Sequence, residues 1–272
     1  MRTPCLEGFY RGIEKAMSTL HLTHITVAAD QKELVHDATL SFASGEVVVL
    51  MGPNGSGKST LVNVVMGHPY YKLTHGSVHV DDKDITGLPV DAKAKQGLFL
   101  SLQHVPRIGG VTLATFLHKV HVARTGEAVD VLEYFLTLRE LAKHYGIDEG
   151  LLNKPLTAGL SGGEKKLAEA LQLAVLAPRF AILDEMDSGV DVDALHTVFR
   201  VVGTLAKKGT GFLIISHHPS LLDHLLPTHV HVMSVGKVVR SGGPELAAAI
   251  LKDGFCKVID CPFEPSCHTK DR

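Results

Sequence analysis

Apolar and polar residues alternate along the first part of the chain in the manner of β-strands. Turn-forming residues separate the segments, and the pattern predicts strands at 20–29, 34–43 and 45–52. The last of these, GEVVVLMG, is β-branched and almost wholly apolar, as expected of a strand buried on both faces of a sheet. A helical pattern follows directly, over 58–68.

Strand and helix patterns then alternate through the rest of the chain. Further strands are predicted at 76–85, 97–105, 179–185, 211–216 and 229–243. Between the second and third of these, apolar residues recur at helical spacing over 128–147, which indicates a helical insert over about 104–159. Alternation of this kind predicts an α/β fold with a mostly parallel sheet. We assign the domain to 18–250, with an N-terminal extension over 1–17 and a C-terminal tail over 251–272.

Composition excludes several classes of function. The 272 residues carry 27 Lys and Arg against 29 Asp and Glu, so no net charge draws the chain to nucleic acid or to an anionic membrane. No apolar run approaches the roughly 20 residues of a membrane-spanning helix. The N-terminus has no continuous apolar core of a secretion signal, and four cysteines make no disulfide framework. We therefore expect a soluble, cytoplasmic protein without direct membrane insertion.

The strongest local signal is GPNGSGKST at 52–60. It fits the phosphate-binding pattern G-x-x-x-x-G-K-[ST] and lies between a predicted buried strand and a predicted helix. Glycines let consecutive backbone N–H groups surround a phosphate, and the helix N-terminus adds positive potential. Lys58 is then expected to reach the β- and γ-phosphates of ATP, and Ser59 to hold Mg²⁺. The alternative is a glycine-rich turn that binds nothing.

A second signal is the pair of carboxylates that ends the predicted strand FAILDE. In this fold class, the carboxyl end of a strand lies beside the phosphate-binding loop. Asp184 is expected to contact Mg²⁺ and Glu185 to polarise the attacking water. A strand that ends in solvated acids is the alternative.

Two single polar residues follow other predicted strands at the same sheet edge. Gln103 follows GLFLSL, and His217 follows GFLIIS. We expect Gln103 to ligate Mg²⁺ or water, and His217 to contact the γ-phosphate and hold Glu185. Taken alone, each is better interpreted as an ordinary polar residue, and only order and position favour a catalytic role.

The segment LSGGE at 160–164 places two glycines at the start of an amphipathic helix. Glycine destabilises a helix by about 1 kcal/mol relative to alanine, so a close backbone approach is the expected reason. Ser161 Oγ and the glycine N–H groups are suited to bind an anion at the helix N-terminus. Two copies packed head to tail would bring this segment opposite the nucleotide of the other copy. The alternative is a serine N-cap with incidental glycines.

These motifs, in this order, resemble those of the ABC-type ATPases over about residues 18–245. The resemblance implies a P-loop NTPase with a RecA-like parallel-sheet core, an antiparallel β subdomain and a helical subdomain. It also implies a dimer that closes on two ATP, with 188–191 as the D-loop at its interface. The implied catalytic residues are Glu185, His217 and Lys58, and the implied Mg²⁺ ligands are Ser59, Gln103 and Asp184. The implied ATP-binding residues are Gly52, Pro53, Asn54, Gly55, Ser56, Gly57, Lys58, Ser59, Thr60, Gln103, Ser161, Gly162 and Gly163.

Within that family, the chain most resembles the SufC group, the soluble ATPases of iron–sulfur cluster assembly. The resemblance is carried by SGGEKK at 161–166, LDEMDSGVDVDAL at 183–195 and QHVPRIGGVT at 103–112. It implies ATP hydrolysis that changes the conformation of SufB- and SufD-like scaffold proteins, bound mainly through the helical insert. The alternative is the nucleotide-binding subunit of an ABC membrane transporter.

The tail contains Cys256, Cys261, Cys267 and His268. Three thiols and an imidazole suit Zn²⁺ or an iron–sulfur cluster. Their spacing is looser than the C-x₂-C of strong metal motifs, and a mobile tail with reduced thiols is the favoured alternative.

Overall fold

Two β-sheets form the framework of the molecule. The computed structural model describes residues 17–101, 110–126, 128–156, 159–186, 191–216 and 225–258. The larger sheet has the strand order β10-β9-β3-β8-β7-β6, and the smaller has the order β2-β1-β4-β5. The strands are β1 (Thr19–Ala29), β2 (Lys32–Ala43), β3 (Val47–Met51), β4 (Lys72–Val80), β5 (Lys83–Asp84), β6 (Leu98–Ser101), β7 (Phe180–Asp184), β8 (Gly211–Ile215), β9 (His229–Ser234) and β10 (Lys237–Gly242).

Helices cover both faces of the larger sheet and build a separate region beyond its edge. The longest in the described part of the chain has 17 residues, and no described helix is long and apolar enough to cross a membrane. The described helices are α2 (Lys58–Met66), α3 (Val90–Lys95), α4 (Leu113–Thr125), α5 (Val131–His144), the 3-10 helix η2 (Glu149–Asn153), α6 (Gly162–Leu176), α7 (Val192–Lys208) and α8 (Pro244–Val258).

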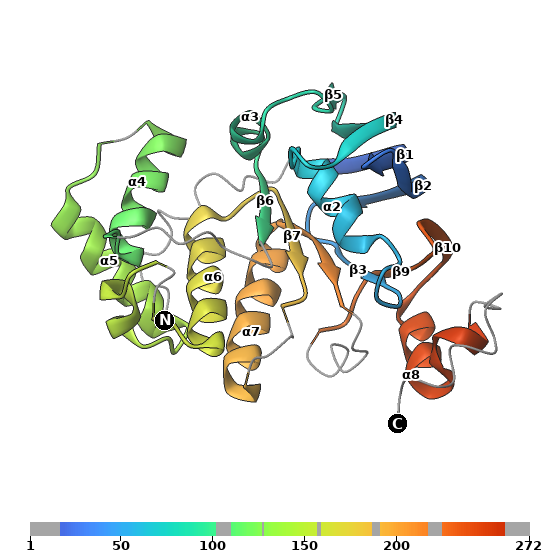
Figure 1. Ribbon diagram of the computed structural model, residues 1–272. Helices are drawn as coiled ribbons and strands as arrows, with labels where there is room; N and C mark the ends of the chain where they lie inside the picture. Colours follow the sequence, from blue (N-terminus) through green and yellow to red (C-terminus); the bar gives the residue numbers. More distant parts are fainter. Residues whose placement is uncertain are drawn as a thin grey trace.

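The topology confirms the predicted fold class. Strands β9, β3, β8, β7 and β6 pair in parallel, and only β10 is antiparallel to its neighbour. The smaller sheet is antiparallel throughout. Helices α4 and α5 lie at the opposite end of the molecule from β1, β2 and β4 (Figure 1). The molecule therefore has a parallel-sheet core with an antiparallel β region on one side and a helical region on the other.

Both faces of β3 are buried, as its apolar sequence predicts. Val47, Val49 and Met51 pack in a cluster with α6, α7 and the helical region. Val48 and Leu50 point the opposite way and pack in a cluster with α2 and the antiparallel sheet. Because successive side chains of a strand alternate between faces, every residue of a strand in this position has to be apolar.

Three features differ from the sequence prediction. The segment 229–243 forms a hairpin, because Val235 and Gly236 both have positive φ, 47° and 77°, as the tightest hairpin turns require. The short helix α3 was not predicted. Helix α8 spans Pro244–Val258 with a kink at the non-helical residue Gly254, so the predicted boundary after residue 250 falls in the helical part before this kink.

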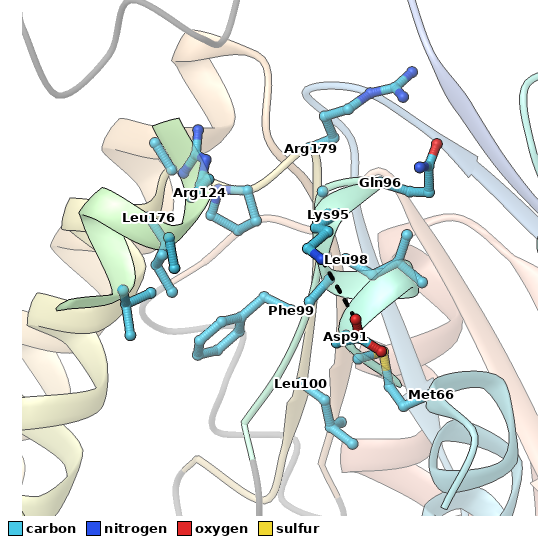
Figure 2. Close-up of a pocket in the computed structure, with 16 residues that line it drawn as sticks. Met66, Asp91, Lys95, Gln96, Leu98, Phe99, Leu100, Arg124, Leu176 and Arg179 are labelled. Carbon is cyan, nitrogen blue, oxygen red and sulfur yellow. Dashed lines mark hydrogen bonds and ion pairs between the residues drawn. The ribbon is translucent and has the colours of Figure 1, made fainter. Parts of the chain in front are cut away.

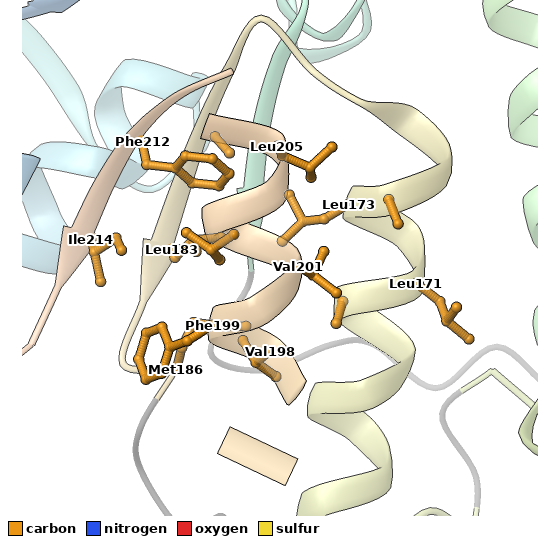
Figure 3. Close-up of a cluster of buried hydrophobic side chains, with 14 of the residues drawn as sticks. Leu171, Leu173, Leu183, Met186, Val198, Phe199, Val201, Leu205, Phe212 and Ile214 are labelled. Atoms are coloured by element: carbon orange, nitrogen blue, oxygen red, sulfur yellow. The ribbon is translucent and has the colours of Figure 1, made fainter. Parts of the chain in front are cut away.

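One part of the core attaches α6 and α7 to the sheet (Figure 3). Leu173, from α6, points toward α7, which contributes Val201 and Leu205, whereas Leu171 points to the opposite side of α6 (Figure 3). Leu183, from β7, is fully buried with them. This contact holds the C-terminal half of α6 against the strand that carries the predicted carboxylates.

We predict that Leu173→Ala lowers the free energy of unfolding by about 2–5 kcal/mol, because it removes a fully buried side chain and leaves a cavity. Urea unfolding followed by circular dichroism measures the change. Leu136→Ala on α5 is the control, since Leu136 is 50% exposed and its loss should change stability by about 0.5 kcal/mol or less. Equal losses in the two variants would contradict the packing of α6.

Candidate active site

The predicted phosphate-binding loop connects the end of β3 to the start of α2. Gly52, Gly55 and Gly57 have φ of 150°, 79° and 100°, which favour glycine. A Cβ on Gly52 would lie 2.1 Å from the carbonyl oxygen of Met233, so a larger residue does not fit there. A glycine loop of this kind, followed by a helix N-terminus, is suited to cradle phosphate groups.

Lys58, the first residue of α2, folds back over this loop. Its side chain is buried, and Nζ donates to the carbonyl oxygens of Gly52 at 2.8 Å and Pro53 at 3.0 Å. Burial lowers the pKa of Lys58, and the carboxylates of Glu185 and Asp184 oppose that shift. Phosphate oxygens in the loop would replace the two carbonyl groups as acceptors for this ammonium group.

Ser59 and Asp184 lie together although 125 positions separate them in sequence. Ser59 Oγ donates to Asp184 Oδ1 at 3.2 Å. Burial raises the pKa of Asp184, while the Ser59 hydrogen bond opposes the shift. A hydroxyl and a carboxylate side by side next to a phosphate loop are hard oxygen ligands of the kind that Mg²⁺ prefers. The donor set therefore fits the predicted metal.

Glu185 follows β7 in an unusual backbone conformation. Its φ is 52°, and its N–H donates to the carbonyl oxygen of Ile215 at 3.1 Å. A non-glycine residue in this region costs of order 1–3 kcal/mol, and such conformations cluster at active sites. The bond to Ile215, at the end of β8, holds Glu185 at the edge where Asp184 lies.

Ser161 caps the N-terminus of α6. Its Oγ accepts from the N–H of Glu164 at 3.2 Å, and the Glu164 carboxylate accepts from the Ser161 N–H at 2.8 Å. This reciprocal arrangement is a capping box. The hydrogen bond that Lys154 donates is the main reason that the pKa of Glu164 falls to about 2, and the Ser161 N–H bond adds to it.

Comparison with known proteins identifies the family of this site. The family profile described as ABC transporter matches residues 35–188. This chain belongs to the ABC transporter ATPase family. It is 40% identical to vegetative protein 296 of Bacillus subtilis, over 88% of this chain and 93% of that protein. It is 39% identical to a probable ABC transporter ATP-binding protein of Streptococcus pyogenes, over 89% of this chain and 95% of that one.

Solved structures support the same assignment at the level of the fold. The crystal structure of a nucleotide-free ATP-binding cassette from an ABC transporter superposes with a TM-score of 0.72 at 26% identity. It covers 90% of this chain and 98% of that one. The predicted ABC-type fold is thereby confirmed.

The close backbone approach expected at the glycines of LSGGE (160–164), called the signature segment below, is found inside the chain. A Cβ on Gly163 would lie 2.6 Å from Asp191 Oδ2. Asp191 is the last residue of the predicted D-loop, and its Oδ1 accepts from the N–H of Ala194 to cap α7. Gly163 therefore lets the start of α6 pack against the start of α7, independently of any contact with a nucleotide.

Several predicted residues lie outside the described part of the ABC domain. These are Gln103, His217 and D-loop residues 188–190, together with Cys261, Cys267 and His268 of the tail; for Cys256 only the backbone is described. Among the described residues, no group of three or more His, Cys, Asp or Glu side chains is placed to hold a metal. Strands β6 and β8, which precede Gln103 and His217, flank β7 in parallel, so their carboxyl ends share its edge. The roles of Gln103 and His217 stay predictions.

Sequence reasoning missed a buried polar cluster beside this ABC site. Glu169 lies on α6 among Ala168, Ala170 and Leu171, and its side chain is only 8% exposed. An acidic residue inside the apolar stripe of a helix is a signal that the sequence does contain, because such a group requires a buried partner.

We predict that Gly163→Ala lowers the free energy of unfolding by about 1–3 kcal/mol, because the added methyl group forces Asp191 or α6 to move. Urea unfolding measures the change. Gly203→Ala in α7 is the matched control: a Cβ there meets nothing within 4 Å, and stability should rise by up to about 1 kcal/mol. Adding Asp191→Ser, which shortens the side chain but keeps a capping oxygen, should restore part of the loss. No restoration would contradict the assigned contact.

Proposed function

We propose that this chain hydrolyses ATP to ADP and phosphate as the motor subunit of a SufBCD-type iron–sulfur cluster assembly complex in the cytosol. The observation that carries the ATPase assignment is the convergence of Lys58, the Ser59–Asp184 pair and Glu185 at one sheet edge. Membership of the ABC family supports it. The segments SGGEKK at 161–166 and LDEMDSGVDVDAL at 183–195 support the SufC-like role.

Each residue of the site has a proposed role in phosphoryl transfer. Residues 52–60 would bind the phosphates through backbone N–H groups, and Lys58 would exchange its carbonyl acceptors for phosphate oxygens. Ser59 and Asp184 would hold Mg²⁺, which neutralises charge on the phosphates when bound. Glu185 would orient a water molecule and take its proton. His217 is proposed to hold the Glu185 and phosphate geometry.

A second copy of the chain is proposed to complete the site. Its Ser161, Gly162 and Gly163 would face the γ-phosphate, because the N-terminus of α6 favours an anion. Hydrolysis removes the γ-phosphate and with it the link between the two copies. The dimer therefore closes and opens once per cycle, and this movement is what would change the conformation of the scaffold proteins.

A groove beside the helical region offers a surface for the scaffold partner (Figure 2). It has a volume of about 530 Å³ and lies between α3, the edge strand β6 and the C-terminal ends of α4 and α6. Leu98, Phe99 and Leu176 give it apolar walls, and Arg124 lies at its border. We propose that SufB- or SufD-like proteins dock here, next to the strand that leads to Gln103.

The other candidate is the nucleotide-binding subunit of an ABC transporter. The names of relatives, such as the probable ABC transporter ATP-binding protein of Streptococcus pyogenes, favour it. The chemistry would be identical, and the groove would receive a membrane protein.

We predict that Glu185→Gln retains ATP binding, lowers kcat about 100-fold or more and traps a dimer in ATP. The amide keeps the size of the side chain and the backbone geometry but is not a base. Phosphate release and sedimentation velocity, with and without ATP, measure the two effects. Unchanged turnover would remove Glu185 from its assigned role, and Glu140→Gln on the outer face of α5 is the control.

A pull-down from native lysate separates the two candidate functions. The tagged chain should recover SufB- and SufD-like proteins without detergent, identified by mass spectrometry. Ala123→Glu places a charge in the groove and should abolish recovery, whereas Leu132→Glu, at a residue 67% exposed on α5, should not. Recovery of a polytopic membrane protein, and only with detergent, would assign the chain to transport instead.

A further inference from the structure

A buried polar cluster joins three segments, and each segment leads to a residue with its own role in the proposed reaction. Ser101 ends β6, two residues before Gln103. Lys166 and Glu169 lie on α6, the helix that begins with the signature glycines. Met186 directly follows Glu185 and is 1% exposed.

One oxygen of Glu169 is at the centre of this cluster. Oε2 accepts from Ser101 Oγ at 3.0 Å and from Lys166 Nζ at 3.1 Å. The Met186 sulfur lies 3.3 Å from Ser101 Oγ and 3.7 Å from Lys166 Nζ. A hydroxyl has one proton, and a carboxylate is a far better acceptor than a thioether, so the serine proton belongs to Glu169. Glu169 is thus bound by one donor from its own helix and by one from the sheet.

Stability alone does not explain such a cluster. Desolvation of a buried ion pair offsets most of its attraction, and apolar side chains of similar size often serve stability as well. The side chains of Lys166 and Glu169 are only 12% and 8% exposed, and Ala168, Ala170 and Leu171 around them are buried. What the polar arrangement adds is direction, because a hydrogen bond fixes the distance and angle between two groups.

Because of where Glu169 lies on α6, its hydrogen bond also controls the orientation of the N-terminal end of the helix. The C-terminal half of the helix is held by the apolar contact with α7. Glu169 is seven residues from Gly162, a lever of roughly 10 Å at 1.5 Å per residue. A small tilt at Glu169 therefore moves the signature segment, and a shift of about 1 Å in a reacting geometry can lower a rate about 100-fold.

We propose that Glu169 is a positioning residue: through its hydrogen bond with Ser101 it fixes α6, and with it residues 161–163 of the signature segment, against β6, the strand that leads to Gln103. Hydrolysis depends on this bond, whereas binding of ATP to residues 52–60 does not. The inference rests on the proposed ATPase function and names a residue that the motifs do not contain.

Three substitutions test the bond itself. Glu169→Leu removes both hydrogen bonds of the cluster. Ser101→Ala removes only the bond to the sheet and leaves the ion pair with Lys166. Both should lower kcat at least 10-fold with ATP affinity changed less than twofold. Glu169→Gln keeps an oxygen that accepts from Ser101 and should retain most of the turnover, because the bond matters here and the charge does not.

The matched control is Glu140→Leu, which breaks an ion pair of the same i,i+3 spacing that is about half exposed on α5. It should leave kcat and affinity unchanged. Thermal unfolding of each variant establishes the folded fraction, so kcat refers to folded protein. A purely structural role of Glu169 would lower kcat and ATP affinity together, or neither.

Two results overturn the proposal. One is Ser101→Ala with a kcat within twofold of the unchanged chain. The other is Glu169→Leu with equal losses of ATP affinity and kcat. If the unchanged chain binds no ATP and releases no phosphate, the proposed function fails rather than this inference. The unchanged chain is therefore assayed first.

Discussion

Parallel pairing of strands that are buried on both faces determines where the chemistry of this protein lies. Side chains within β3, β7 and β8 face packed layers on either side, so nothing polar is available along their length. Polar groups first occur where each strand ends, and parallel strands all end at one edge. Lys58, Asp184 and Glu185 meet there although more than 120 positions separate the first from the others.

Two kinds of close approach shape the parts of the site that lie within one copy of the chain. At Gly52 a backbone carbonyl oxygen of β9 excludes any side chain, and at Gly163 a Cβ would require the Asp191 carboxylate to shift. The first shapes the loop proposed for phosphates, and the second joins the signature helix to the D-loop. Gly52 and Gly163 therefore have internal steric reasons, beside any contact with nucleotide.

A polar contact connects α6 to the edge strand β6. It is the hydrogen bond between Ser101 and Glu169, at the base of the segment that leads to Gln103. The groove proposed for a partner borders the same strand, β6. A partner seated there would act on the strand whose end is bound to α6, which gives docking and hydrolysis a shared structural element.

The sequence determined the class of fold and the residues at the sheet edge, because both depend on local patterns. Three local patterns can be interpreted without tertiary context. They are an all-apolar β-branched strand, a glycine loop before a helix, and carboxylates at the end of a strand. The hairpin of β9 and β10 was missed because Val235 adopts positive φ, which an apolar pattern does not reveal. Asp191 beside Gly163, and Ser101 beside Glu169, were decided only by the tertiary structure. Contacts between residues 28 and 68 positions apart depend on how α6 packs against its neighbours, and no spacing along the chain encodes that geometry.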